Sequence, residues 1–172
     1  MRRRPMMDRI PKRARRAVLL SILMFGSVFS YLFISNLVFG YVQVSGESML
    51  PTLHGGETYV LQRWMYAYGD PDRTHIVALR DPLDDGLSVK RIIGLPGDAV
   101  SLADGAVVVN GTELIEAYLP ESMKTIQMTP EGAHFRLAPN EYFVLGDNRQ
   151  NSIDSRIYGP VTRDRILGPI VP

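Results

Sequence analysis

The longest uncharged stretch of the chain constrains its fold more than any other feature. No residue from Ala17 to Gly46 carries a charge, and the part from Ala17 to Phe39 is strongly apolar. In a helix, these 23 residues would extend about 35 Å, which is enough to cross a hydrocarbon core of about 30 Å. We therefore predict a transmembrane helix over residues 17–40.

The charges before this stretch distinguish it from other apolar segments. Residues 1–16 contain eight basic side chains and a single acid. A cleaved secretory signal also starts with basic residues, but its apolar part is usually about 7–15 residues long and ends at a small-x-small site. This stretch is longer and no good Ala-x-Ala site follows it, and the dense flanking arginines argue against a buried core helix.

Basic residues tend to stay on the cytoplasmic side of a membrane. We therefore expect a single-pass protein of the cell membrane, with residues 1–16 as a cytoplasmic tail and residues 41–172 as an extracytoplasmic domain. The eight residues that follow Gly40 cover at most about 27 Å when extended, so Ser48 is expected near the outer membrane surface.

Composition excludes several classes of function. Residues 17–172 carry 11 basic and 17 acidic side chains, and such an acidic body would repel nucleic acid. The chain has no cysteine, which excludes disulfides, thiolate metal sites and a cysteine nucleophile. Its three histidines are scattered without metal-ligand spacing, so we expect neither a metal nor another cofactor.

Residues 41–172 are expected to be mainly β. Four short segments are rich in β-branched and aromatic residues, namely 57–63, 75–80, 87–93 and 141–145. Asp104-Gly105 and Asn110-Gly111 suit tight turns with positive φ, which predicts two consecutive hairpins. Residues 116–140 show no clear pattern and are interpreted as a long loop or an exposed hairpin. We predict one compact antiparallel β domain.

Three polar segments in this domain could carry chemistry. They are Ser45–Leu53 (SGESMLPTL), Lys90–Asp98 (KRIIGLPGD) and Gly146–Arg156 (GDNRQNSIDSR). A serine hydroxyl needs a base to become a nucleophile, and none of these segments contains a histidine. A lysine can act as the base if it is neutral, and burial among apolar groups favours the neutral amine.

The strand pattern around Lys90 suits such a base. With a period of two, Lys90 shares a face with Ile92, whereas Arg91 points to the opposite face. Each segment alone also has an ordinary interpretation. Lys90 could be an edge-strand lysine that discourages aggregation, Ser48 could begin a turn, and the third segment could be a solvated loop.

Taken together, the three segments resemble the signature boxes of the type I signal peptidase family, in the right order and behind the expected membrane anchor. The resemblance implies the compact single-anchor form, with an antiparallel β-sheet or barrel-like catalytic domain after the helix. It implies a serine endopeptidase that cleaves N-terminal signal peptides from exported precursors. The implied partners are these precursors, membrane lipid and the export translocon, with no nucleic acid.

Carried over residue by residue, the resemblance makes Ser48 the nucleophile, Lys90 the general base and Ser152 the group that orients the lysine amine. The positions implied to support the site are Arg91, Asp147, Asp154 and Arg156, with Arg91 opposite Asp147. The oxyanion hole would use the backbone N–H of Ser48. Some family members add a hydroxyl two residues earlier, where this chain has Gly46, so a backbone N–H or a water would supply the second donor.

Other classes are possible. A specialised precursor-processing peptidase of the same family, of the pilus or conjugation type, would carry the same boxes. A membrane-tethered β domain without catalytic activity would need neither Lys90 nor Ser152. Self-cleaving repressors also pair a Ser-Met serine with a distant lysine, but this N-terminus leaves no room for a DNA-binding head. Penicillin-recognising enzymes need Ser-x-x-Lys, and Pro51 stands at that position.

Overall fold

The computed structural model describes residues 11–128 and 134–171. The chain separates into two compact units, Met1–Val38 and Phe39–Pro172.

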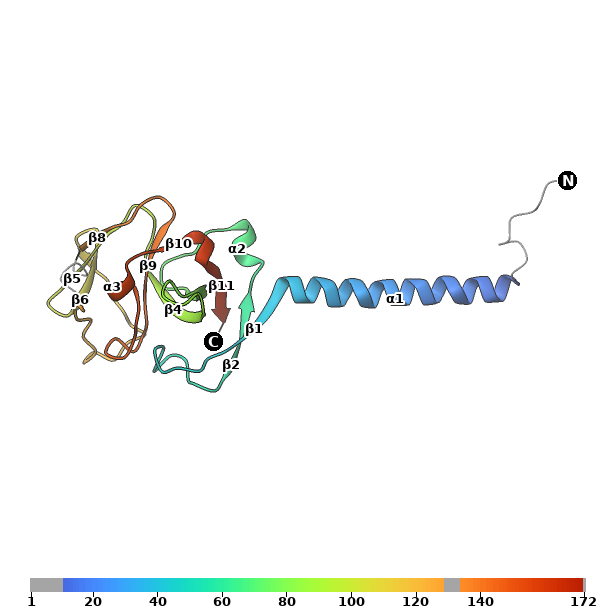
Figure 1. The fold of residues 1–172 in the computed structure, drawn as a ribbon, viewed down its shortest axis with the longest axis horizontal. Coiled ribbons are helices and arrows are strands. Elements are labelled where there is room, and N and C mark those ends of the chain that lie inside the picture. The colour runs from blue at the N-terminus through green and yellow to red at the C-terminus, as the bar shows by residue number, and fades with distance from the viewer. Residues whose placement is uncertain (1–10, 129–133, 172) are drawn as a thin grey trace. The chain divides into compact units, whose positions relative to one another are not determined.

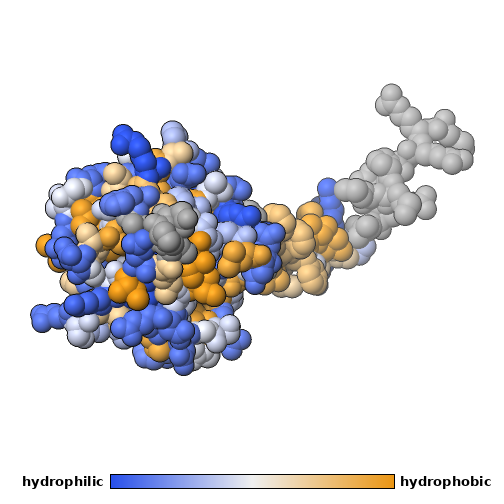
Figure 2. Space-filling view, turned by 60° about the vertical axis from the view of Figure 1, so that its left-hand side comes forward, coloured by the Kyte–Doolittle hydropathy of each residue, from blue (hydrophilic) through white to orange (hydrophobic). Residues whose placement is uncertain are grey.

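The first unit is a single long helix, α1 (Lys12–Val38) (Figure 1). Its large apolar side chains from Val18 to Ile34 are exposed, and its surface is mostly orange in Figure 2. Ser21 and Ser27 donate their hydroxyls to carbonyl oxygens of their own helix, those of Ala17 and Met24, which satisfies these polar groups without water. Among the described residues, this is the one helix long and apolar enough to cross a membrane. It starts at Lys12 rather than Ala17, and residues 39 and 40 belong to a strand.

The second unit contains two antiparallel sheets (Figure 1). The larger has the order β1-β2-β11-β3-β4-β9-β10, formed by β1 (Phe39–Gln43), β2 (Thr58–Gln62), β11 (Ile166–Val171), β3 (Ile76–Arg80), β4 (Leu87–Gly94), β9 (Glu141–Leu145) and β10 (Val161–Thr162). The smaller has the order β7-β6-β5-β8, formed by β7 (Thr112–Glu113), β6 (Ala106–Val109), β5 (Ala99–Ala103) and β8 (His134–Arg136). The short helices are α2 (Met65–Tyr68), α3 (Ser155–Tyr158) and a 3-10 turn (Arg163–Arg165).

The four segments predicted as strands form β2, β3, β4 and β9. The two predicted hairpins join β5 to β6 and β6 to β7, and all four turn residues have positive φ. The stretch 116–140 consists of turns and irregular chain over 116–128, followed by β8 from His134. Its residues 129–133 lie outside the described residues.

Strand β4 lies inside the larger sheet, between β3 and β9. Its residues Leu87–Arg91 pair with β3, whereas β9 pairs only with Arg91, Ile92 and Gly94. Among the described residues, no strand therefore pairs with Leu87–Lys90 on the side away from β3. Within residues 11–128 and 134–171, strand β1 pairs with β2 alone, so it also keeps one free edge. These two free edges matter for the site described below.

The packing of the core between the two sheets explains why residue 94 is a glycine. Buried side chains from β4, β9 and the smaller sheet form one apolar cluster. Gly94 passes through this cluster, and a Cβ there would come within 2.7 Å of side-chain atoms of Leu137 and Val100. Only a residue without a side chain lets β4 cross at this point.

Candidate active site

Ser48 and Lys90 meet in space although 42 residues separate them. Ser48 is half-buried in the turn that follows β1, and Lys90 lies on β4 at the end of its unpaired edge. The Lys90 Nζ donates a hydrogen bond to the Ser48 Oγ at 3.2 Å. The amine is thus at the distance at which a base can take the hydroxyl proton.

The environment of Lys90 favours its neutral form. The residue is only 5% exposed, and its partner across the strand pair, Val77, is completely buried, as is Ile92 on the same face. Burial lowers the pKa of Lys90 below its ordinary value, because the charged ammonium loses its hydration. The carboxylates of Asp154 and Asp81 act in the opposite direction but do not cancel this shift.

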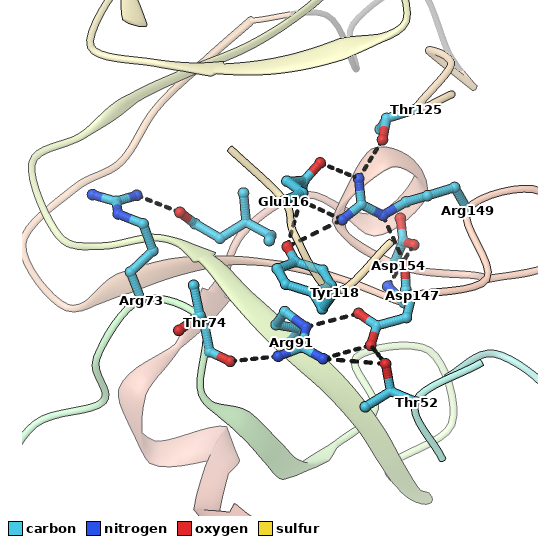
Figure 3. A network of polar contacts seen from close by, with 12 residues as sticks. Thr52, Arg73, Thr74, Arg91, Glu116, Tyr118, Thr125, Asp147, Arg149 and Asp154 are labelled. Atoms are coloured by element: carbon cyan, nitrogen blue, oxygen red, sulfur yellow. Dashed lines mark hydrogen bonds and ion pairs between the residues drawn. The ribbon is translucent and has the colours of Figure 1, made fainter. Parts of the chain in front are cut away.

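Arg91 points away from Lys90 and pairs with Asp147. Its Nε and Nη2 donate to the two carboxylate oxygens at 2.8 and 2.6 Å, and both residues are buried (Figure 3). The Thr52 hydroxyl donates to the same carboxylate, and Arg91 Nη1 donates to the carbonyl oxygen of Thr74. This bidentate pair joins the three polar segments, because Thr52 belongs to the first segment, Arg91 to the second and Asp147 to the third.

A buried ion pair between Asp154 and Arg156 stabilises the third polar segment. The Asp154 carboxylate accepts two bonds from the Arg156 guanidinium, at 2.8 and 2.7 Å, and caps the start of α3. It also accepts the backbone N–H of Gly146 at 3.1 Å. Both charged residues are 0% exposed, so each compensates the other in a place without water. The loop between β9 and α3 is therefore closed on itself.

Gly146 brings this loop against Ser48. A Cβ at this position would overlap the Oγ of Ser152 and lie 2.5 Å from the carbonyl oxygen of Ser48. The same carbonyl accepts the N–H of Asn148 at 2.9 Å. The Ser152 hydroxyl is buried and makes no hydrogen bond with any part of the chain that the structure describes. The hydrogen bond expected between Ser152 and the Lys90 amine is thus not formed in this structure.

Ser48 and Gly46, the positions expected to form the oxyanion hole, lie in an open region of the structure. Ser48 N–H donates to no acceptor within residues 11–128 and 134–171. A Cβ on Gly46 would meet no atom within 4 Å. The backbone at both positions can therefore be approached by a substrate.

Sequence reasoning missed a second buried network, which involves Arg149 and residues 116–125. Arg149 is 0% exposed and pairs with Glu116 through Nη1 at 2.8 Å and Nη2 at 2.5 Å. It also donates to the Thr125 hydroxyl and, through Nε, to the carbonyl oxygen of Gly146. The ring of Tyr118 lies 3.8 Å from the Arg91 guanidinium and its hydroxyl accepts from Arg149, so it joins the two arginines (Figure 3).

The signal for this network in the sequence is weak. Arg149 belongs to the third polar segment, where it is one of several charges that a solvated loop could equally carry. Glu116 and Tyr118 occur in a stretch without hydrophobic periodicity. Their role depends on contacts with a residue more than 30 positions away, which no local pattern records.

Two cavities meet at Ser48. The first, of about 330 Å³, is lined by residues 42–46 and Ser48 on one side and by residues 87–90 of β4 on the other. The second, of about 390 Å³, is lined by residues 46–48, residues 150–153, Met128 and Ile157. The two share only Gly46 and Ser48. A chain that crosses Ser48 can thus occupy one cavity on each side of the hydroxyl.

A family model for signal peptidase, peptidase S26, matches residues 15–171. The chain belongs to the signal peptidase I family. Signal peptidase I S of Bacillus subtilis (strain 168) is 39% identical over 144 residues, which cover 80% of this chain and 77% of the relative. Signal peptidase I of Bacillus licheniformis is 37% identical over 131 residues, covering 73% and 70% respectively.

The crystal structure of a signal peptidase I from Enterococcus faecalis V583 has the same fold. It matches with a TM-score of 0.52 and 33% sequence identity, and the match covers 60% of this chain and 98% of that one. The expected fold class, an N-terminal apolar helix followed by antiparallel β-sheets of signal peptidase type, is confirmed. As a signal peptidase I, the protein is a membrane-anchored serine endopeptidase that acts on signal peptides. Membership of this family excludes the non-catalytic β domain.

Proposed function

We propose that this signal peptidase works with Ser48 as nucleophile and Lys90 as general base. The observation that carries the proposal is the 3.2 Å contact between Lys90 Nζ and Ser48 Oγ, made by an amine that is almost completely buried. A lowered pKa makes a larger fraction of Lys90 neutral at a given pH than for a solvated lysine, and only the neutral amine can accept a proton.

The reaction follows from this geometry in two steps. Ser48 Oγ attacks the carbonyl carbon of the scissile bond while Lys90 Nζ takes the hydroxyl proton. Lys90 then gives that proton to the leaving amine, and the signal peptide stays on Ser48 as an ester. Water attacks this ester, Lys90 takes a proton from the water and returns one to Ser48 Oγ, and the signal peptide leaves as a carboxylic acid.

In both steps, negative charge develops on the carbonyl oxygen that is attacked, and hydrogen-bond donors are needed to stabilise it. The free N–H of Ser48 is the first donor in the proposal. Gly46 has no side chain that could serve as the second, so a backbone N–H or a water completes the hole. The open space beside Gly46 leaves room for either.

The remaining residues act as positioning groups. The pair of Arg91 and Asp147 holds the strand of Lys90 to the third segment, and the pair of Asp154 and Arg156 holds that segment closed. Ser152 lies against Gly146 beside Ser48, and a rotation of its free hydroxyl would allow it to orient the Lys90 amine.

The substrate is proposed to bind as an extended strand. Both free edges described above, β1 and residues 87–90 of β4, line the first cavity. A peptide between them can form backbone hydrogen bonds as an added strand. Valines at positions 42, 44 and 89 line this cavity, which suits small apolar residues at the first and third positions before the cut.

The domain organisation follows from the same proposal. Residues 1–16 would be a cytoplasmic tail and the apolar part of α1, residues 17–38, the membrane span. The extracytoplasmic catalytic domain would begin with β1 at Phe39, two residues earlier than expected from the sequence. The basic N-terminus supports this orientation. Precursors held in the bilayer or emerging from the export translocon, together with the surrounding lipid, would then lie within reach of Ser48.

The test uses the full-length chain in detergent with a precursor substrate. We expect Ser48→Ala and Lys90→Ala to abolish cleavage, and Lys90→Arg to be equally inactive because arginine keeps its proton. The exposed residues Ser122 and Lys124 offer matched controls, and Ser122→Ala and Lys124→Ala should cleave at the wild-type rate. Near-normal turnover by Lys90→Ala would refute the proposed pair.

A further inference from the structure

The cavity of about 390 Å³ on the other side of Ser48 has no role in the mechanism above. Its wall is built by the two residues before Ser48, by residues 150–153 of the third segment, and by two apolar side chains, Met128 and Ile157. Only Gly46 and Ser48 belong to both cavities. The cavity of about 390 Å³ is therefore continuous with the nucleophile, Ser48.

The lining of this cavity is suited to a peptide. Ile153, Ile157 and Met128 are 55%, 43% and 36% exposed, so three large apolar side chains face solvent around one opening. The amide side chains of Gln150 and Asn151 border it and can bind a peptide backbone. Such a combination of apolar surface and a few polar groups is typical of ligand sites.

The occupant follows from the direction of the chain. A substrate chain that crosses Ser48 places the residues before the scissile bond in one cavity and the residues after that bond in the other. The part before the cut has to stay in place while the ester is hydrolysed, which suits the two strand edges of the first cavity. The part after the cut has to depart, which suits a loop-lined opening without strand edges.

We propose that the cavity of residues 46–48, 150–153, Met128 and Ile157 binds the first residues of the mature protein, directly after the scissile bond. This inference rests on the proposed function of Ser48. An uncharged, apolar side chain fits the exposed isoleucines. An acidic side chain is disfavoured because the Glu47 carboxylate stands at the same opening.

The test measures which fraction of the acyl-enzyme reacts with water and which fraction reacts with an added amine. An amino acid amide that binds in this cavity attacks the ester carbonyl with its amine nitrogen. Ser48 Oγ then leaves and recovers a proton, and the signal-peptide part is released as an amide instead of an acid. The ratio of the two products reports binding after the cut, independently of how tightly the signal peptide itself binds.

Leucine amide and aspartic acid amide serve as the two probes, with full-length enzyme in detergent and a precursor peptide. We expect leucine amide to be captured about tenfold better than aspartic acid amide. The double variant Ile153→Ser, Ile157→Ser should lose about tenfold in capture of leucine amide relative to hydrolysis of the same acyl-enzyme. Glu47→Gln should improve capture of aspartic acid amide. The 88% exposed Ile115 lies outside the cavity, and Ile115→Ser should change neither ratio.

Each outcome separates the two proposals. No cleavage by the wild-type enzyme, or cleavage without a Ser48 ester, would refute the proposed function itself. Normal cleavage with capture that is insensitive to the isoleucine substitutions would overturn the assignment of this cavity alone. It would also be overturned if those substitutions changed the preference for residues before the cut, or if they acted only in lipid vesicles, which would identify lipid as the occupant.

Discussion

Glu116→Gln perturbs the buried network around Arg149 without changing its shape. Arg149 has no exposed side-chain surface and Glu116 is only 12% exposed at its side chain. The substitution leaves the guanidinium in a buried place with an uncharged partner. Removing one charge of a buried pair typically costs about 3–5 kcal/mol. Since the amide oxygen of Gln still accepts one hydrogen bond, we expect the free energy of unfolding to fall by about 3 kcal/mol.

The matched control is an exposed ion pair on the same unit. Arg165 and Asp85 lie 2.8 Å apart, with side chains 32% and 72% exposed. Water screens such a pair, so Arg165→Gln should cost less than about 1 kcal/mol. Urea unfolding of the full-length variants in detergent, followed by the fluorescence of the single tryptophan, Trp64, measures both changes.

The same substitution should also slow catalysis. Arg149 donates to the carbonyl oxygen of Gly146 and accepts Arg156 at its own carbonyl, so it holds the loop that packs against Ser48. A loose loop should lower kcat by roughly ten- to a hundredfold. KM should change little, because Glu116 lines neither cavity at Ser48. If Glu116→Gln were no more destabilising than Arg165→Gln and kept a normal kcat, the network would have no part in holding the site.

Two glycine substitutions test the local geometry. Gly146→Ala should reduce the rate of acylation by more than about a hundredfold, because the new methyl group overlaps Ser152 Oγ and approaches the Ser48 carbonyl; a wild-type acylation rate in rapid-quench measurements would contradict this packing. Gly46→Ser should fold normally, since its Cβ meets no atom within 4 Å, and its hydroxyl should raise kcat by up to about tenfold as an additional oxyanion donor. A tenfold fall in kcat would argue against the open space at Gly46 or against its place beside the oxyanion.

Local physics made much of the fold predictable. The long apolar helix follows from an uncharged stretch, and β-branched segments mark β2, β3, β4 and β9. The period of two along β4 correctly separates Lys90 from Arg91, because neighbouring side chains of a strand must face opposite sides. The two hairpins follow from Asp-Gly and Asn-Gly turns, whose positive φ few other residues adopt easily.

The parts that could not be predicted depend on long-range contacts. Nothing near Arg149 in the sequence indicates that Glu116 compensates it, since the pair spans 33 positions. The division of β4 between β3 and β9 creates the free edge beside Lys90, and only the assembled sheet reveals it. The free hydroxyl of Ser152 depends on a side-chain rotation that a motif does not specify.

The pH dependence of kcat/KM tests the neutral lysine most directly. The base accepts a proton only when it is uncharged, so the rate should rise with pH through the pKa of Lys90 and then level off. Burial places this midpoint below the ordinary 10.5, and Asp81→Asn should move it further down because one carboxylate that raises the pKa is gone. A rate that is independent of pH, or that rises only near the pKa of a solvated lysine, would contradict the account.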